Sequence, residues 1–329
     1  PRAGGRAANE AGRMGRGTIR GSGGAKVSSI KNKVKRVAVY QKLKKEGQKK
    51  DREGRKIRQK EAEALGEDAP KPPPQRTLDN TRETEESMVR PGDDEVIGED
   101  SFDEFASHFA GEAAPRIVVT TSRYPSRQLL SFLEEVVALF PNAEYRQRGA
   151  VPIKAVVKAA AKRDFTMLLV FTEKAKVCHG LWMVKLPEGP TARFKLSNLV
   201  MPERIAGRGR ATGHRPELIL NNFSTRLGHR VGRFLGCLVP HDPQFRGRQV
   251  VTMHNQRDFI FFRHHRYVFE EKKKREGTGN EIGARLQELG PRFTLKLKSL
   301  QMGTFDTQHG EYEWKHKPEL DTSRRRFHL

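Results

Sequence analysis

The chain has 329 residues and carries 63 lysines and arginines against 40 aspartates and glutamates, which gives a formal net charge of +23 and a pI near 10.2. Such a surplus opposes compact folding by self-repulsion unless a polyanion neutralises it. Nucleic acid is therefore the expected partner, an anionic membrane is the second candidate, and a merely soluble basic protein is the plain alternative. Two cysteines exclude a disulfide framework and the usual cysteine-based zinc site, and they fit the cytosol or the nucleus.

Neither a membrane-spanning segment nor a secretory signal is expected. The sequence contains no run of about 18 apolar residues, the length that a membrane-spanning helix needs. The arginines and glycines at the N-terminus are not followed by the apolar core of a secretory signal.

The N-terminal segments are strongly basic. Residues 1–29 hold mainly glycine, arginine and alanine, and we expect a disordered Gly/Arg tail because such a segment buries too little apolar surface to offset its ordering entropy. Residues 26–60 carry 15 lysines and arginines against 3 acids. We predict a basic helical or extended segment over residues 30–69, which RNA phosphates would order and which alternatively serves nuclear import.

The next segment inverts the charge. Residues 79–112 contain 12 acids against two arginines, and a proline cluster that predicts a stiff spacer lies ahead of them. Phe102, Phe105 and Phe109 recur at spacings of three and four, which predicts a short amphipathic helix. Residues 70–114 are therefore expected to form a Pro-rich and then acidic linker. Two interpretations stay open: a plain linker, or a helix that docks on a basic groove of a partner or of this protein itself.

A globular domain is expected over residues 115–302, because two strand–helix pairs recur about 100 residues apart. Their expected bounds are a strand at Arg116–Ser122 with a helix at Ser126–Phe140, and a strand at Glu217–Ser224 with a helix that ends near Val239. We predict an α/β domain of two pseudo-symmetric halves, about residues 115–200 and 216–302, in which helices cover a sheet.

Two further landmarks indicate the repeat. Arg163-Asp164-Phe165 and Arg257-Asp258-Phe259 each precede an apolar run, and we interpret the matched aspartates as a repeated structural salt bridge. Gly189–Leu199 matches Gly290–Leu300 at five of eleven positions.

The matched strands are predicted to have one cationic face. Residues 294–298 (Thr-Leu-Lys-Leu-Lys) alternate between polar and apolar side chains, and residues 193–197 (Arg-Phe-Lys-Leu-Ser) do the same. A sheet with one charged face usually leaves it in water or against a ligand.

The helix of the second half is the first candidate site. At 100° per residue its cations fall within an arc of about 100°; they are Arg226, His229, Arg230 and Arg233. Gly228, Gly232 and Gly236 form a separate stripe, which is expected where another backbone packs close, since glycine weakens a helix. The arc holds no carboxylate that could form intrahelical pairs. We predict that it binds RNA phosphates; a solvated basic face is the alternative.

A second cluster combines cations with aromatic residues. Arginine can donate two parallel hydrogen bonds to a phosphate or stack on a base, and aromatic rings supply further stacking surfaces. The predicted RNA-binding residues here are Arg246, Arg248, His254, Gln256, Arg257, Arg263, His265 and Arg266, joined by Lys296 and Lys298 from the alternating strand. The run Phe259–Phe262 is interpreted as sheet core in preference to a base platform, and the side of residues 258–269 that contacts RNA is left open.

The C-terminal extension, residues 303–329, carries anchoring aromatic residues at Tyr312 and Trp314. Arg324, Arg325 and Arg326 form a terminal basic patch, predicted to contact RNA or to serve nuclear import.

Searches for catalytic or metal-binding patterns indicate neither. His254, His264 and His265 have no cysteine nearby, and their spacing matches no common zinc pattern. The sequence has no GxxxxGK[ST] loop, no HExxH and no GxSxG. We expect no catalytic residues, no metal, no cofactor and no small-molecule substrate.

Several stretches resemble the Brix domain. They are Ile117–Ser122, Gly189–Ala192 with Phe194, Pro216–Phe223 with Thr225–Gly228, Pro243–Phe245, His254–Arg263 and Glu288–Leu295. The similarity to one branch of this family continues through the C-terminal extension, and it covers residues 30–329.

The resemblance implies a Brix domain of two halves, each similar to an anticodon-binding α/β domain, with basic tails. It implies a nucleolar factor bound to precursor large-subunit rRNA, with other nucleolar assembly factors and large-subunit ribosomal proteins as partners. We therefore expect a non-enzymatic rRNA-binding factor that supports assembly and processing of the precursor 60S subunit as a scaffold or chaperone. The alternatives are a small-subunit factor of the same family and an RNA-processing enzyme.

Overall fold

The computed structural model describes residues 30–65, 75, 77, 79–83, 86–90, 92–140, 142–273, 280–305, 310–320, 323 and 325–329. The chain divides into two compact units, residues 1–76 and 77–329. The predicted tail of residues 1–29, the proline cluster at 70–74 and Arg324 lie outside the described residues.

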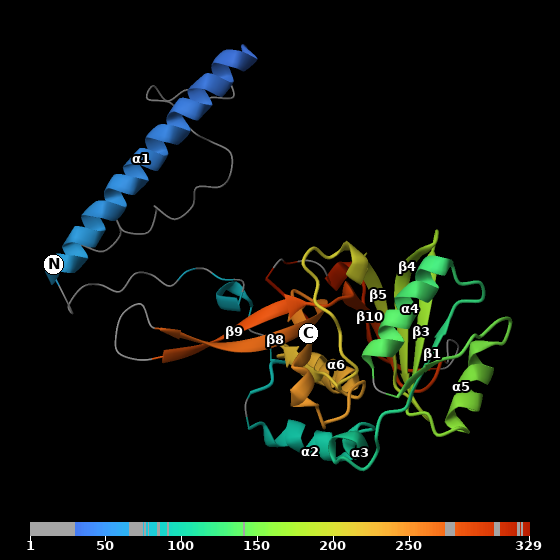
Figure 1. The fold of residues 1–329 in the computed structure, drawn as a ribbon. Coiled ribbons are helices and arrows are strands. Elements are labelled where there is room, and N and C mark those ends of the chain that lie inside the picture. Colours follow the sequence, from blue (N-terminus) through green and yellow to red (C-terminus); the bar gives the residue numbers. More distant parts are fainter. Residues whose placement is uncertain are drawn as a thin grey trace, which may run out of the picture. The chain divides into compact units, whose positions relative to one another are not determined.

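In the first unit the structure has a 33-residue helix, α1 (Lys33–Leu65), inside the range where the sequence predicts a basic helical or extended segment (Figure 1). Asn32 caps it, because its side-chain oxygen accepts the backbone N–H groups of Val34 and Lys35 at 3.0 and 3.1 Å. Val34 and Ile57 are 78% and 57% exposed, so burial of an apolar face contributes little to this helix. None of the described helices combines the length and the apolar character that crossing a membrane requires.

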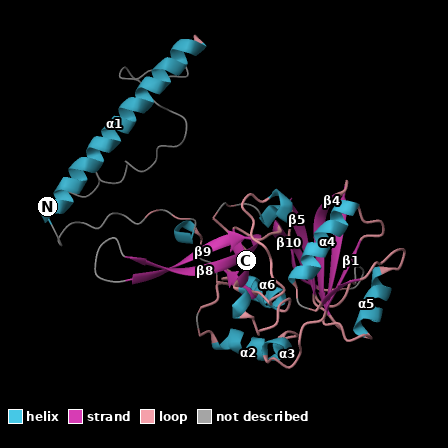
Figure 2. Cartoon of the chain, in the orientation of Figure 1, coloured by secondary structure: helices cyan, strands magenta, loops and turns pink. Residues whose placement is uncertain are grey.

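The second unit is built on strands and helices in two consecutive halves (Figure 2). The first half has β1 (Ile117–Thr121), α4 (Arg127–Leu139), β2 (Ala143–Tyr145), α5 (Ile153–Ala161), β3 (Met167–Lys174), β4 (Val177–Lys185) and β5 (Thr191–Val200). The second half has β6 (Glu217–Asn221), α6 (Arg226–Gly236), β7 (Gln249–Gln256), β8 (Phe259–Lys273), β9 (Asn280–Glu288) and β10 (Arg292–Gln301), followed by β11 (Tyr312–Lys315). Two helices precede them, α2 (Asp94–Phe102) and α3 (Ala106–Phe109), and 3₁₀ turns lie at Asp79–Thr81, Pro202–Arg204, Phe245–Gly247 and Pro318–Leu320.

The described strands form one eleven-stranded sheet with an internal repeat. Its main order is β2-β1-β3-β4-β5-β10-β8-β7-β6, while β9 pairs with β8 and β11 with β10. In the first half β1 is parallel to β3, and β3, β4 and β5 follow as antiparallel neighbours. In the second half β6 is parallel to β7, and β7, β8 and β10 follow in the same way. The halves meet where β5 pairs antiparallel with β10, so the predicted α/β fold with two matched halves is confirmed.

The glycine–proline landmark of the repeat is confirmed. Gly189 and Gly290 have positive φ angles of 115° and 78°, and each lies two residues before its strand, β5 or β10. The predicted alternation along these strands is confirmed as well, because Phe194 and Leu196 on β5 are 1% exposed and Leu295 on β10 is 2% exposed.

The two Arg-Asp-Phe segments do not occupy equivalent positions in the two halves, so this part of the predicted repeat is wrong. Asp164 lies between α5 and β3, whereas Arg257 and Asp258 form the hairpin turn between β7 and β8. The counterpart of that turn is Ala175–Lys176 between β3 and β4. Both turns have two residues with positive φ, 52° and 64° in one and 57° and 62° in the other, as the twist of a tight hairpin demands. The expected salt bridge is therefore not repeated, and Asp258 instead accepts the backbone N–H groups of residues 328–329 at 2.8 and 2.9 Å.

Helices lie on both faces of the sheet (Figure 1). Leu133 of α4 and Phe234 of α6 belong to one apolar core, which also contains the inward residues of both halves. Val157 of α5 belongs to a second, smaller cluster with Val118 and Leu168. Because side chains alternate along a strand, this second cluster lies on the opposite face, and it covers the first half only.

The glycine stripe of α6 meets neighbours of two kinds. A Cβ atom at Gly228 would lie 2.7 Å from the carbonyl carbon of Leu329, so a second backbone does pack close there, as predicted. At Gly232 and Gly236 the nearest atoms belong to aromatic rings, at 3.6 and 3.0 Å. The expectation of close backbone packing thus holds at the first glycine, and the other two accommodate flat side chains.

We predict that Gly228→Ala lowers the free energy of unfolding by about 1–3 kcal/mol, because the added methyl group overpacks a site walled by backbone. Gly232→Ala is the matched control, because an added methyl group there would lie at an ordinary contact distance of 3.6 Å from its nearest neighbour. Alanine also favours a helix by about 1 kcal/mol over glycine. Urea unfolding of both variants measures the difference. Equal stabilities would contradict the packing of Leu329 on α6.

Candidate nucleic-acid interface

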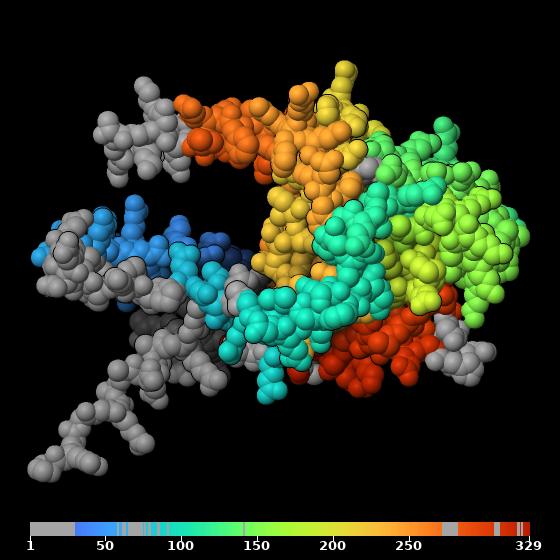
Figure 3. Space-filling model, turned by 90° about the horizontal axis from the view of Figure 1, so that it is seen from below, coloured from blue at the N-terminus to red at the C-terminus, as the bar shows by residue number. Residues whose placement is uncertain are grey.

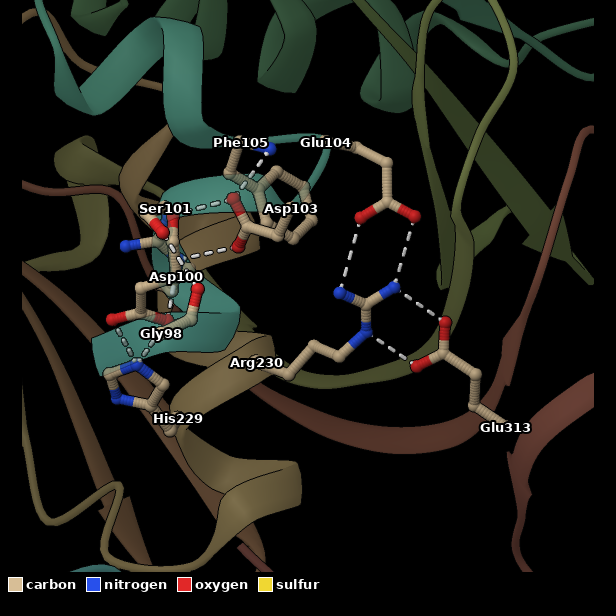
Figure 4. A network of polar contacts seen from close by, with 10 residues as sticks. Gly98, Asp100, Ser101, Asp103, Glu104, Phe105, His229, Arg230 and Glu313 are labelled. Atoms are coloured by element: carbon tan, nitrogen blue, oxygen red, sulfur yellow. Dashed lines mark hydrogen bonds and ion pairs between the residues drawn. The ribbon is translucent and has the colours of Figure 1, made fainter. Parts of the chain in front are cut away.

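The cations of α6, the first predicted RNA-binding group, are engaged by carboxylates (Figure 4). His229 Nε2 lies 2.9 Å from both carboxylate oxygens of Asp100. Arg230 is held between two glutamates: it donates to Glu313 at 2.6 and 2.7 Å and to Glu104 at 3.2 Å through two nitrogens. Burial by itself would lower the pKa of Arg230, but the hydrogen bonds to Glu313 and Glu104 outweigh it and raise the pKa.

Two further ion pairs extend this network, one of them buried and the other exposed. Arg233 donates to both oxygens of Asp103 at 2.7 Å, and the two side chains are only 12% and 11% exposed. Arg226 donates to Glu95, but these side chains are 44% and 65% exposed. The hydrogen bond from Arg226 is the main reason why the pKa of Glu95 is lowered.

All but one of these carboxylates come from a single segment, residues 93–110, which we call the acidic strap. It contains α2 and α3, and in the space-filling view its teal atoms lie between the gold atoms of the second half and the green atoms of the first (Figure 3). Asp93 caps α2 by accepting the backbone N–H of Glu95 at 3.2 Å. Acidic residues in the first turn, Asp94 and Glu95, further favour the helix by interacting with its dipole.

Aromatic residues anchor the acidic strap on the same helix. Phe105 is fully buried and stacks on Phe234 of α6 with ring centroids 5.4 Å apart. The guanidinium of Arg233 lies 4.3 Å from the ring centroid of Phe109. Phe102, in contrast, is 92% exposed. The single amphipathic helix predicted from these three rings is not formed, because α2 ends at Phe102 and α3 begins at Ala106. Of the open interpretations, docking of this segment on basic side chains of this protein itself is the one that the structure bears out.

The result is that the α6 cations face a local excess of negative charge. Three arginines and one histidine meet the carboxylates of Glu95, Asp100, Asp103, Glu104 and Glu313. A phosphate could reach Arg230 or Arg233 only after these carboxylates were displaced, and leaving a buried charge without its partner is strongly unfavourable. The prediction that α6 binds RNA phosphates therefore carries a cost that the sequence alone did not reveal.

We predict that Arg233→Ala lowers the free energy of unfolding by about 3–5 kcal/mol, because it leaves the buried Asp103 carboxylate unpaired. Arg226→Ala should have a much smaller effect, since its pair with Glu95 is exposed to solvent. Chemical denaturation of both variants, with Asp103→Ala added to complete a double-mutant cycle for Arg233, tests this. Similar losses of stability in Arg233→Ala and Arg226→Ala would contradict the inference that the buried ion pair contributes more than the exposed one.

His108 of α3 makes the acidic strap sensitive to acid. Burial lowers the pKa of His108, and the positive charges of His241 and Lys185 lower it further. Since its folded pKa lies below the ordinary value of 6.5, the unfolded chain takes up the proton first as the pH falls. The stability that His108 contributes is thus present above pH 6.5 and is lost as the pH falls through the folded pKa.

We predict that the free energy of unfolding decreases between pH 7 and pH 5, and that the decrease is smaller in His108→Phe, which cannot titrate. His264 and His265 also have lowered pKa values because they are buried, so part of the dependence will remain. Thermal unfolding at several pH values provides the measurement. An unchanged pH dependence in the variant would show that His108 is not the group responsible.

Part of the second predicted group lies on the other side of the sheet from α6. We call the outward residues of four adjacent strands the cationic sheet face: Arg193 and Lys195 of β5, Lys296 of β10, Phe259, Phe261 and Arg263 of β8, and His254 and Gln256 of β7. Lys195 pairs with Lys296 across the junction of the halves, and His254 pairs with Phe261. Arg193, Lys195 and Gln256 are exposed, and His254, Arg263 and Lys296 are half-buried.

The aromatic run in β8 is divided between the two faces. Ile260 and Phe262 are 0% and 1% exposed in the core, as predicted for the whole run. Phe259, however, is 40% exposed and Phe261 is half-buried on the cationic sheet face. Each has a cation beside it: Lys296 Nζ lies 5.2 Å from the Phe259 centroid and the Arg263 guanidinium 5.8 Å from that of Phe261. The interpretation of the run as core is therefore correct for alternate residues and wrong for the others.

The remaining predicted residues are spread over the surface. Arg246, Arg248, Arg257, Arg325 and Arg326 are exposed, whereas His265, Arg266 and Lys298 are half-buried. Arg248 and Arg266 are close together, because β7 begins opposite Arg266 and the backbone carbonyl of Arg248 accepts the backbone N–H of Tyr267 at 2.9 Å. Arg257 lies beside the C-terminal segment, with its guanidinium 5.8 Å from the ring centroid of Phe327.

Sequence reasoning missed two members of the site. Arg193 and Lys195 of β5 were recognised as part of an alternating strand but were not among the predicted RNA-binding residues, although both are exposed and Arg193 lies 5.0 Å from the ring centroid of Trp182. The signal that would have found them is the match between the two glycine–proline strands, since equivalent strands present equivalent faces.

The cysteines and acids offer little for catalysis or metal binding. Burial raises the pKa of the Cys178 and Cys237 thiols to about 12, so neither is an activated nucleophile at neutral pH. Within the described ranges, no group of three or more histidine, cysteine and acidic side chains is arranged to hold a metal ion.

Comparison with known proteins places these features in a family. The model of the Brix domain matches residues 122–299. Ribosome production factor 1 of Pongo abelii is 47% identical over 308 residues, which are 93% of this chain and 86% of that protein. A Brix domain-containing protein of Schizosaccharomyces pombe is 42% identical over 314 residues, 92% of this chain and 100% of its own length. A crystal structure of a probable ribosomal biogenesis protein from Aeropyrum pernix K1 covers 55% of this chain and 96% of its own, with 15% identity and a TM-score of 0.38.

Proposed function

Because this chain belongs to the Brix-domain family, we propose that it is an rRNA-binding factor that supports assembly and processing of the precursor large ribosomal subunit as a scaffold or chaperone. The coarser part of this statement, a role in ribosome biogenesis, follows from its likeness over 93% of its length to a protein named ribosome production factor 1. That likeness is the observation that carries the proposal. The binding of precursor rRNA, the large subunit and a nucleolar location are the further steps that we propose.

The charge of the chain supports RNA as the ligand. A net charge of +23 is neutralised most directly by a phosphate backbone, and binding then releases condensed counterions. We propose that the exposed predicted residues make the phosphate contacts; they are Arg246, Arg248, Gln256, Arg257, Arg325 and Arg326. The half-buried cations of β8 and β10 join them.

A structural role is favoured over RNA cleavage by the state of the acids. The clustered carboxylates of Asp100, Asp103, Glu104 and Glu313 are bound to His229, Arg230 and Arg233. Metal-assisted hydrolysis needs carboxylates that are available to bind cations. In this cluster they stabilise a helix packed on a sheet.

We predict that crosslinking the protein to RNA in its native cells, followed by sequencing of the attached fragments, enriches precursor large-subunit rRNA. The purified full chain should bind a transcript of the enriched region, with an affinity that falls linearly with salt on logarithmic axes by a slope of about 0.9 per phosphate neutralised on a duplex. The length of that transcript should stay unchanged in Mg²⁺.

Each outcome has a separate meaning. Enrichment of small-subunit precursor would favour a small-subunit factor of the same family. Cleavage of the transcript by the purified protein, lost in a variant of a single acid, would favour an enzyme. A folded chain that ignores every precursor transcript even at low salt would contradict RNA binding itself.

A further inference from the structure

The two cationic surfaces of this domain differ in what surrounds their charges. On α6 the arginines are bound to the acidic strap and to Glu313, at distances of 2.6–3.2 Å for Arg230 and 2.7 Å for Arg233. On the cationic sheet face the charges lie beside aromatic rings, with Lys296 next to Phe259 and Arg263 next to Phe261. A polyanion must therefore displace carboxylates to bind Arg230 or Arg233, whereas the sheet presents the exposed side chains of Arg193 and Lys195 on the same face as these rings.

From this contrast we infer that the cationic sheet face is a binding site for single-stranded RNA, with bases stacked on Phe259 and Phe261 and phosphates bound by Lys195, Lys296 and Arg193. The inference rests on the proposed function, because it takes RNA as the ligand. It assigns the contact to a surface that lies on the opposite side of the sheet from α6.

The sheet itself sets the spacing of the cations. Lys195 and Lys296 are paired residues on the antiparallel strands β5 and β10, and Phe259 of β8 comes next in the same row, as its contact with Lys296 requires. Neighbouring strands lie about 4.8 Å apart, so the row holds two ammonium groups and one ring within roughly 10 Å. Arg193 lies outside this row, two residues from Lys195 along β5, with its guanidinium 5.0 Å from the ring centroid of Trp182.

The spacing of the rings favours single strands over duplexes. Phe259 and Phe261 are two residues apart on β8, which separates them by roughly 7 Å along the strand. Bases in a duplex are stacked about 3.4 Å apart and are closed to such rings, whereas unstacked bases of a single strand can lie on aromatic side chains one by one. A sheet that combines the exposed ring of Phe259 and the half-buried ring of Phe261 with lysine and arginine is suited to that ligand.

The test uses the full chain and fluorescence anisotropy with a labelled 12-nucleotide RNA of mixed sequence, as a single strand and as a duplex. We expect the wild type to bind the single strand more tightly. Phe259→Leu keeps the apolar character and removes the aromatic surface, so it should weaken single-strand binding about tenfold. Phe259→Tyr keeps the ring and should bind as the wild type does.

A second pair of variants tests the lysines. Lys195→Gln with Lys296→Gln should reduce the logarithmic salt slope by about 1.4, because each phosphate of a single strand that a lysine neutralises adds about 0.7 to that slope. Lys154→Gln with Lys158→Gln removes the same charge from exposed positions of α5 and is the matched control. The melting temperature of each variant verifies that it is folded.

The outcomes separate the inference from the function on which it rests. If the wild type binds neither RNA, the proposed function fails. If the wild type binds but Phe259→Leu and Phe259→Tyr are equal, or the α5 pair weakens binding as much as the sheet pair, the sheet site is refuted. Loss of binding in Arg226→Gln, with the sheet variants unaffected, would return the RNA contact to α6 and would also refute it.

Discussion

The antiparallel pairing of β5 with β10 is the constraint on which the rest of the structure depends. It joins two halves of the same design into one sheet, and its register sets Lys195 opposite Lys296 and Phe194 opposite Leu297. One face of the junction is therefore apolar and becomes the shared core under α4 and α6, while the other is cationic. The register cannot slip by one residue without moving the core residues into water and the lysines into the core.

The acidic strap neutralises the positive charge of α6. A helix with three arginines and a histidine on one side would repel the rest of a chain that is already strongly positive. Residues 93–110 bring four of the five carboxylates that meet it, and Phe105 anchors them by filling the core beside Phe234. The charge of α6 is thus used within the molecule.

Local patterns in the sequence were sufficient for much of the fold. The alternation around Leu295 and Phe194 and the turn at each glycine–proline pair depend on near neighbours in the chain, and the structure agrees with both. The Arg-Asp-Phe match failed because three identical residues can occupy a helix–strand loop in one half and a hairpin turn in the other. The run Phe259–Phe262 was assigned wrongly in part because a strand buried on one side still contains aromatic residues on its outer side.

The sequence by itself determined the two matched halves, because similar segments recur along it. It also determined the cationic arc of α6 and the alternation of the strands, because periodicity along one element fixes which side chains share a side. Tertiary structure alone decided which cations meet carboxylates. Arg233 and Asp103 are 130 residues apart in the chain, and no periodicity relates them. Their pairing depends on where the acidic strap packs, and that depends on the three-dimensional fit of Phe105 into the core, a long-range interaction that no local pattern encodes.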